Sequence, residues 1–167
     1  MITVFHGSIV EVTNPLVTLG RPNLDFGQGF YVTDLEQQAQ RWAERMGRRK
    51  LSQPIISVYD FDKELAAESY NYLKFDAYDK NWLDFIVGNR KGRMLWQGYD
   101  VIEGGVANDN VIDTVEDYMR GRMSAEAALA ELSKHQPNNQ MCLLNQQVVN
   151  RCLHFVTSIN LKEYAES

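Results

Sequence analysis

Hydrophobic and polar residues follow one another along this chain in patterns that predict both strands and helices. β-Branched and aromatic residues concentrate in six short stretches, which is typical of strands. The predicted strands are residues 2–5, 27–33 (led in by two glycines), 55–61, 99–106, 140–144 and 154–161. Elsewhere apolar residues recur every three or four positions, and this spacing predicts helices. The predicted helices are residues 35–48, 64–75, 79–87, 111–119, 125–135 and 146–152.

Polar residues at the ends of these segments indicate where the helices begin. Asp34 and Ser124 are predicted to cap the first and fifth helices, because their side-chain oxygens can accept from the free N–H groups of a first turn. Residues 9–25 contain prolines, glycine and asparagine and predict a long loop, which in a small domain is often functional. Three apolar positions of the first helix are expected to form its buried stripe: Ala39, Trp42 and Met46.

The order of the elements favours an α+β fold. Strands and helices mix without the regular strand–helix–strand repeat of a doubly wound parallel sheet. A length of 167 residues and a hydrophobic content of 44% fit one globular domain, residues 1–167. Cys142 and Cys152 lie in apolar surroundings without the spacing of a zinc site. We therefore expect core cysteines in a reducing compartment, and no metal.

Net charge and hydropathy limit the partners and the compartment expected for this protein. The net charge of −5 argues against a broad nucleic-acid footprint, which needs basic residues to replace phosphate counterions. Basic runs at residues 45–50 and 90–93 fit a solvated helix end and a loop. The first residues do not resemble a signal peptide, and no stretch approaches the roughly 18 apolar residues of a membrane span. A cytoplasmic, soluble protein with no membrane contact is expected.

Three short segments contain the candidate chemistry. His6, Gly7 and Ser8 follow the first strand; a histidine there can donate a hydrogen bond to a ribose hydroxyl, and a glycine lets a ligand approach the backbone. Residues 25–33, Asp-Phe-Gly-Gln-Gly-Phe-Tyr-Val-Thr, combine two glycines for a tight bend with aromatic rings that can stack on a flat heterocycle. Gln140 opens an otherwise apolar strand. Each segment alone also fits an ordinary structural role.

Together the three segments resemble the ADP-ribosyltransferase superfamily. The most similar branch is the diphtheria-toxin-like and poly(ADP-ribose)-polymerase-like one, which has a His-Tyr-Glu triad. In that branch a His-Gly-Ser/Thr strand precedes a Phe-Gly-x-Gly-x-Tyr strand and a helix, and this chain has HGS, FGQGFYVT and QQAQRWA in that order. The run GVAND at residues 105–109 and the strand NQMCL at residues 139–143 make the chain most similar to a bacterial domain family of unknown function within this superfamily.

The resemblance implies an ADP-ribosyltransferase-like fold: a split, mainly antiparallel pair of sheets with flanking helices around an NAD cleft. NAD would be the substrate. His6 would bond a ribose, the backbone of Gly7 would hold the nicotinamide carboxamide, and Tyr31 would stack on the nicotinamide ring. The further pocket residues that the resemblance implies are Ser8, Gly29, Phe30 and Thr33.

Gln140 stands where this branch has its catalytic glutamate. Glutamine keeps the hydrogen bond to ribose but lacks the negative charge that offsets an oxocarbenium-like transition state, and it lacks basicity. Polymer elongation is therefore not expected, whereas a single transfer is. The acceptor could supply its own nucleophile, or Asp100, Glu103 or Asp109 could act as the base.

The resemblance thus implies a mono-ADP-ribosyltransferase, an enzyme of the glycosyltransferase class. It would move ADP-ribose from NAD to an acceptor, most simply a macromolecule, and release nicotinamide. In bacteria it implies a toxin-like or phage-defence role with a neutralising antitoxin partner. Three alternatives stay open: an NAD glycohydrolase at the same site, a catalytically inactive NAD-binding or ADP-ribose-binding module, and an unrelated interaction module in which His6 and Tyr31 are structural.

Overall fold

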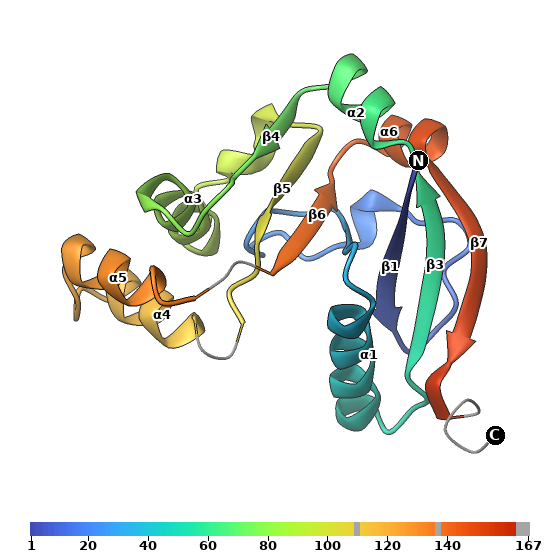
Figure 1. The fold of residues 1–167 in the computed structure, drawn as a ribbon, viewed down its shortest axis with the longest axis horizontal. Coiled ribbons are helices and arrows are strands. Elements are labelled where there is room, and N and C mark those ends of the chain that lie inside the picture. The colour runs from blue at the N-terminus through green and yellow to red at the C-terminus, as the bar shows by residue number, and fades with distance from the viewer. Residues whose placement is uncertain (109–110, 136–137, 163–167) are drawn as a thin grey trace.

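The computed structural model describes residues 1–108, 111–135 and 138–162, and within these ranges it has an α+β architecture with two sheets (Figure 1). In chain order the elements are β1 (Ile2–Ser8), η1 (Val17–Leu19), β2 (Phe30–Val32), α1 (Glu36–Lys50), β3 (Ile55–Phe61), α2 (Lys63–Ser69), β4 (Tyr72–Lys74), α3 (Lys80–Arg90), η2 (Leu95–Gly98), β5 (Val101–Gly105), α4 (Ile112–Met119), α5 (Ala125–Leu132), β6 (Asn139–Leu143), α6 (Gln146–Cys152) and β7 (Leu153–Asn160). The predicted α+β class and the mainly antiparallel sheet pair are confirmed.

The two sheets meet at the segments that carry the first two motifs. One sheet has the order β1-β3-β7 and the other the order β2-β6-β5-β4; the β4–β5 pair is parallel and the other pairs are antiparallel. Phe5 and Thr33 form an antiparallel bridge between the sheets, with N–H to carbonyl distances of 2.8 and 2.9 Å. This bridge sets β1 beside β2, so His6 and Tyr31 become neighbours.

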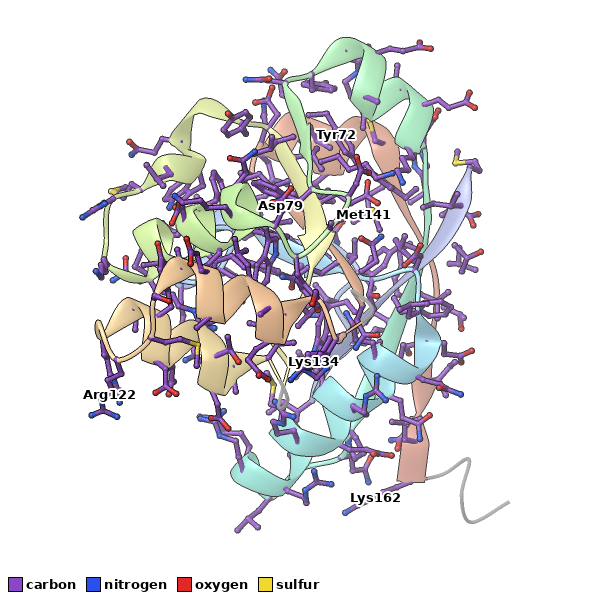
Figure 2. The ribbon with its side chains drawn as sticks, turned by 60° about the vertical axis from the view of Figure 1, so that its left-hand side comes forward. Tyr72, Asp79, Arg122, Lys134, Met141 and Lys162 are labelled. Atoms are coloured by element: carbon purple, nitrogen blue, oxygen red, sulfur yellow. The ribbon has the colours of Figure 1, made fainter. Side chains whose placement is uncertain are left out.

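Buried apolar side chains among the described residues form layers on both sides of each sheet. The first core lies between the sheets and includes Val4, Tyr59 and Met141; Figure 2 shows Met141 well inside the molecule, whereas Arg122 projects at its periphery. The second core lies between the β6–β5 face and helices α3, α4 and α5, around Trp82. The third and smallest lies beneath α1. These hydrophobic layers hold the sheet junction in place.

Several predicted elements are confirmed, and the structure corrects the bounds of others. Residues 55–61 and 146–152 form β3 and α6 as predicted. The first strand does not end at residue 5 but continues through Ser8, because β1 stays paired with β3 along its whole length. His6 therefore lies inside a strand. The predicted helix at residues 64–75 is wrong beyond Ser69, since residues 72–74 pair with β5 as strand β4. Sheet pairing outweighs local helix propensity there.

The start of α1 also differs from its prediction. Asp34 does not cap it: the N-cap residue is Leu35, without a side-chain cap, and the Thr33 hydroxyl accepts from the Leu35 N–H at 3.1 Å. Ser124 does cap α5, through the Ala127 N–H.

The buried residues of α1 are three small ones together with Gln38. Ala39 is fully buried as predicted, but Trp42 and Met46 are only partly buried, while Ala43 and Gly47 are buried instead. The helix backbone lies so close to β1 that large side chains are displaced to the edges of the contact. Trp42 is therefore wrongly predicted as a core residue.

Two further expectations concern the interior and the membrane. Cys142 and Cys152 are both buried and unpaired, which confirms them as core cysteines. In the ranges that the structure describes, no helix has both the length and the apolar character that crossing a bilayer requires.

Candidate functional site

A groove of about 340 Å³ lies at the junction of the two sheets. Its walls come from β1 (His6), from Gly29 and the start of β2 (Phe30 and Tyr31), from Met46 of α1, and from the long loop predicted at residues 9–25, which contributes Arg21 among others. A groove of this volume is at the small end of ligand sites and suits part of a nucleotide rather than all of it. Two of the three predicted catalytic residues, His6 and Tyr31, thus line one groove.

His6 is held in a defined orientation and protonation state. Its Nδ1 lies 2.7 Å from the Tyr31 carbonyl oxygen, and because a carbonyl can only accept, Nδ1 carries the proton and Nε2 keeps a lone pair. The ring stacks on Phe30, with centroids 4.3 Å apart and planes at 29°. Burial lowers the pKa of His6 below its usual 6.5, against the opposing effect of the Tyr31 bond. At neutral pH the ring is therefore uncharged, and Nε2 is an acceptor rather than the donor that the sequence suggested.

The Tyr31 carbonyl bonds to His6, whereas the Tyr31 side chain lies on the other face of its sheet, toward helices α3–α5. Its hydroxyl donates to the Gly27 carbonyl at 2.7 Å and accepts from the Phe26 N–H at 3.1 Å. Burial, followed by the proximity of Cys142, raises the Tyr31 pKa far above 10. The ring packs on the core beneath α3–α5, whereas Phe30 belongs to the core between the sheets. The aromatic ring next to His6 is therefore that of Phe30.

Gln140 lies on β6, next to β2 but outside the groove lining. It pairs with Gly104 of β5, and strand alternation puts it on the same sheet face as Cys142, which pairs with Tyr31. The side chain is 4% exposed, and its Nε2 has no acceptor in the part of the chain that the structure describes. Buried amide donors without an acceptor are uncommon in native proteins.

The other predicted pocket residues already have structural partners. A Cβ on Gly7 would lie 2.1 Å from the Ala39 carbonyl oxygen, and one on Gly29 would lie 2.5 Å from the Leu143 carbonyl oxygen. Close packing therefore accounts for both glycines. The Ser8 hydroxyl contacts the Met46 sulfur at 3.7 Å, and the Thr33 hydroxyl donates to the Asn139 carbonyl at 2.7 Å.

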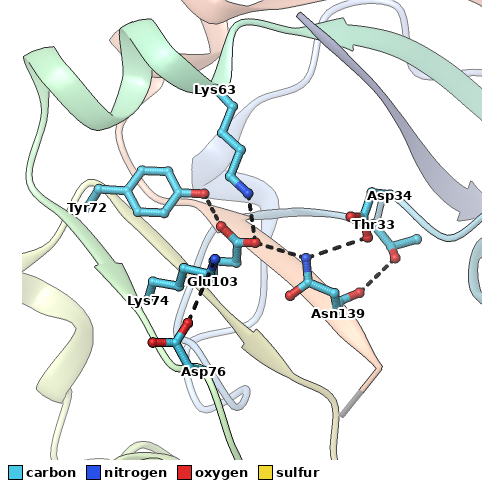
Figure 3. A network of polar contacts seen from close by, with 8 residues as sticks. All are labelled: Thr33, Asp34, Lys63, Tyr72, Lys74, Asp76, Glu103 and Asn139. Carbon is cyan, nitrogen blue, oxygen red and sulfur yellow. Dashed lines mark hydrogen bonds and ion pairs between the residues drawn. The ribbon is translucent and has the colours of Figure 1, made fainter. Parts of the chain in front are cut away.

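The carboxylate of Glu103 is the centre of a polar network that the sequence analysis missed (Figure 3). It accepts from Lys63 Nζ at 3.0 Å, from the Tyr72 hydroxyl at 2.5 Å and from Asn139 Nδ2 at 2.9 Å. Burial alone would raise the pKa of Glu103, but these partners outweigh it and lower the pKa below 4.5. A saturated, ionised carboxylate that is 2% exposed ties α2, β4, β5 and β6 together and is poorly suited to act as a base. The sequence signal was a lone glutamate in the apolar stretch VIEGG.

Of the two other candidate bases, the one that the structure describes already has structural partners. Asp100 accepts from the Asn71 N–H at 2.8 Å and from Asn145 Nδ2 at 3.2 Å, so it fastens two connecting segments. Asp109 lies outside the described residues. Among the described residues that line the groove, none is acidic.

Comparison with known proteins identifies a family but not an activity. No curated protein and no solved structure matches the chain. The model of a family described as "Protein of unknown function (DUF3990)" matches residues 2–155. This span contains every residue predicted for the site, from His6 to Gln140. The chain therefore belongs to the DUF3990 family of proteins of unknown function.

Proposed function

We propose that this protein is a mono-ADP-ribosyltransferase that transfers ADP-ribose from NAD to a macromolecular acceptor and releases nicotinamide. The observation that carries the proposal is the setting of His6: a neutral, oriented imidazole beside an aromatic ring, in a groove where two sheets meet. An acceptor nitrogen suits a sugar hydroxyl, and aromatic walls suit a flat base. The order of the HGS and FGQGFYVT segments, which resembles the ADP-ribosyltransferase superfamily, supports it.

In this proposal each wall of the groove has a distinct task. His6 Nε2 accepts a hydrogen bond from a hydroxyl of the nicotinamide-side ribose, and the Tyr31 carbonyl keeps the imidazole in the required tautomer. Phe30, whose ring stacks on His6, provides the aromatic surface for the nicotinamide end. Arg21 is exposed at the groove and would pair with the pyrophosphate.

The reaction breaks the bond between the nicotinamide nitrogen and ribose C1. The bonding electrons leave with nicotinamide, positive charge develops on the ribose, and the acceptor nucleophile then bonds to C1 and gives its proton to water. Gln140 lies outside the groove lining, so the proposal gives it no contact with that charge. Because none of the described groove residues is acidic, the acceptor itself has to supply a competent nucleophile.

The same observation favours a second candidate, a module that binds NAD or ADP-ribose without cleaving it. Such a module needs the oriented histidine and the aromatic walls but no carboxylate. An NAD glycohydrolase, with water as the acceptor, would use the same groove. In the transferase proposal the protein works in the cytoplasm, as a toxin-like or phage-defence effector with a neutralising partner.

Labelled NAD distinguishes these candidates. The purified protein is incubated with NAD labelled on its adenine side, alone and with a bacterial lysate treated with protease or with nucleases. A transferase attaches label to material in the lysate, and the treatment that removes the labelled product identifies the acceptor class. Free labelled ADP-ribose without attachment indicates a glycohydrolase. Bound but intact NAD indicates the binding module, and folded protein that neither binds nor cleaves NAD refutes the proposal.

A further inference from the structure

Residues 20–29, which we call the groove loop, connect η1 to β2 and contribute Arg21 and Leu24, among others, to the groove at the sheet junction. Every residue of the loop is described, and none lies in a helix or strand. A Cβ on Gly20 would lie 2.6 Å from the Gly29 carbonyl oxygen, so the two ends of the loop touch. This contact holds one side of the exposed stretch from Arg21 to Leu24. The position of the stretch therefore depends on what anchors its other side.

On that other side, helix α3 holds Asp25 by two bonds. Arg90 Nε donates to Asp25 Oδ1 at 2.7 Å, and the two side chains are only 22% and 16% exposed. Asn89, which is fully buried, donates from Nδ2 to the Asp25 carbonyl oxygen at 2.8 Å. The two donors are consecutive residues in the last turn of α3, and they hold both the side chain and the backbone of Asp25. We call Asp25, Asn89 and Arg90 the α3 clamp.

The α3 clamp joins the groove loop to a well-packed part of the molecule. Helix α3 is fixed in the second core by buried side chains such as Trp82. The loop has further contacts at Gly27, whose carbonyl accepts from the Tyr31 hydroxyl and whose backbone packs against the Trp96 ring. These contacts come after Asp25, so the exposed stretch before it depends on the clamp. Segments with few anchors open locally at a low cost in free energy, and the clamp therefore limits the motion of the stretch.

We propose that the α3 clamp positions Arg21 to bind the pyrophosphate of NAD, which makes Asp25 and Arg90 positioning residues. The inference rests on the proposed function, in which Arg21 pairs with the pyrophosphate. A guanidinium binds phosphate well only in a defined orientation, because two parallel N–H groups have to meet two oxygens. His6, by contrast, is fixed by strand β1 and by the Tyr31 carbonyl. Loss of the clamp should therefore weaken NAD binding and leave the cleavage step almost unchanged.

Nicotinamide release, measured over a range of NAD concentrations, separates binding from cleavage. Asp25→Ala and Arg90→Ala should each raise the KM for NAD about five- to tenfold, part of the value of a charge-assisted bond to phosphate. Both should keep kcat within about twofold of the wild type. Asp84→Ala, the matched control, breaks the Lys80–Asp84 ion pair of the same helix and should change neither constant. A folded Asp25→Ala variant with the wild-type KM overturns the inference, and so does one whose kcat falls while its KM stays the same.

A double-mutant cycle shows whether the α3 clamp acts through Arg21. Arg21→Ala should raise the KM by itself, but it should raise the KM of Asp25→Ala little further, because the guanidinium is already misplaced. Fully additive effects overturn the inference.

Amide hydrogen exchange tests the α3 clamp without NAD. Residues 20–29 should exchange faster in Asp25→Ala than in the wild type, and residues 55–61 of β3 should exchange at the same rate. Unchanged exchange in the groove loop shows that the clamp does not anchor it and overturns the inference by itself. A folded wild type that does not bind NAD refutes the proposed function instead, and with it the assignment of Arg21 to the pyrophosphate.

Discussion

Replacing Glu103 by alanine is predicted to be among the most destabilising single changes in this fold. The substitution leaves three donors without their acceptor: Lys63 Nζ, the Tyr72 hydroxyl and Asn139 Nδ2. Lys63 is 32% exposed and can bind water instead, so the loss of its bond to Glu103 lowers the unfolding free energy little. The two other bonds, each to a charged group, contribute roughly 1.5–3 kcal/mol apiece. The expected loss is about 3–5 kcal/mol of unfolding free energy, in line with breaking a buried ion pair from one side.

Urea unfolding followed by tryptophan fluorescence measures this loss as a shift of the transition midpoint. Glu103→Gln keeps the shape and one acceptor oxygen and should lose less than the alanine variant. Glu68→Ala removes an exposed carboxylate from neighbouring α2 and should stay within about 0.5 kcal/mol of the wild type. If Glu103→Ala lowers the unfolding free energy by less than about 1 kcal/mol, the network does not hold the β2-β6-β5-β4 sheet to α2.

The pH dependence gives an independent check on Glu103. Its partners lower its pKa in the folded protein below the usual 4.5, so the unfolded chain takes up the proton first as the pH falls. The stability due to Glu103 is then fully present above about pH 4.5 and is lost as the pH drops through the lower folded value. The unfolding free energy of Glu103→Gln should therefore change less across this acid range than that of the wild type.

Three further predictions concern the site. Gly7→Ala forces a Cβ against the Ala39 carbonyl and should lower the unfolding free energy by about 1–3 kcal/mol. Gly98→Ala, with open space around it, should lower it by almost nothing. Equal shifts in the thermal unfolding midpoints of the two variants would show that α1 moves away from β1 easily. Because burial lowers the His6 pKa below 6.5, the unfolded chain binds the proton first, so stability should fall as the pH drops below 6.5. A His6→Asn variant should lose this dependence of stability on pH. An unchanged dependence would mean that another group causes it. Gln140→Glu should leave the rate of NAD cleavage unchanged, because Gln140 lies outside the groove lining; faster cleavage by the folded variant would show that this position reaches the ribose and is the counterpart of the catalytic glutamate.

The sequence predicted correctly those elements whose conformation follows from the residues within the segment itself. Residues 55–61 and 146–152 are such cases: β-branched and aromatic content predicts strand β3, and the local pattern of residues 146–152 predicts helix α6. Strand β4 was missed because its extended conformation depends on pairing with β5, almost thirty residues further along the chain. For the same reason the sequence did not show that β1 continues through His6, which needs β3 as a partner.

The site was predictable as a set of residues but not as an arrangement. The segments around His6 and Tyr31 could be identified from their motifs, and the structure joins them through the His6–Tyr31 hydrogen bond and the Phe5–Thr33 bridge. Which ring would face His6 could not be predicted, because it depends on which face of β2 turns toward the other sheet. The close approach of α1 to Gly7 and the partial exposure of Trp42 depend on tertiary packing and leave no local signal.

Nicotinamide release from NAD, compared between the wild type and His6→Asn, tests whether His6 takes part in the cleavage of NAD. Asparagine can still donate to the Tyr31 carbonyl in place of Nδ1, but it has no atom in place of Nε2. In the proposed mechanism the wild type releases nicotinamide. The variant, shown by thermal unfolding to be folded, should release it at least about tenfold more slowly, the loss expected for one hydrogen bond in the transition state. Release by the variant at the wild-type rate, or a folded wild type that leaves NAD intact, would contradict this mechanism.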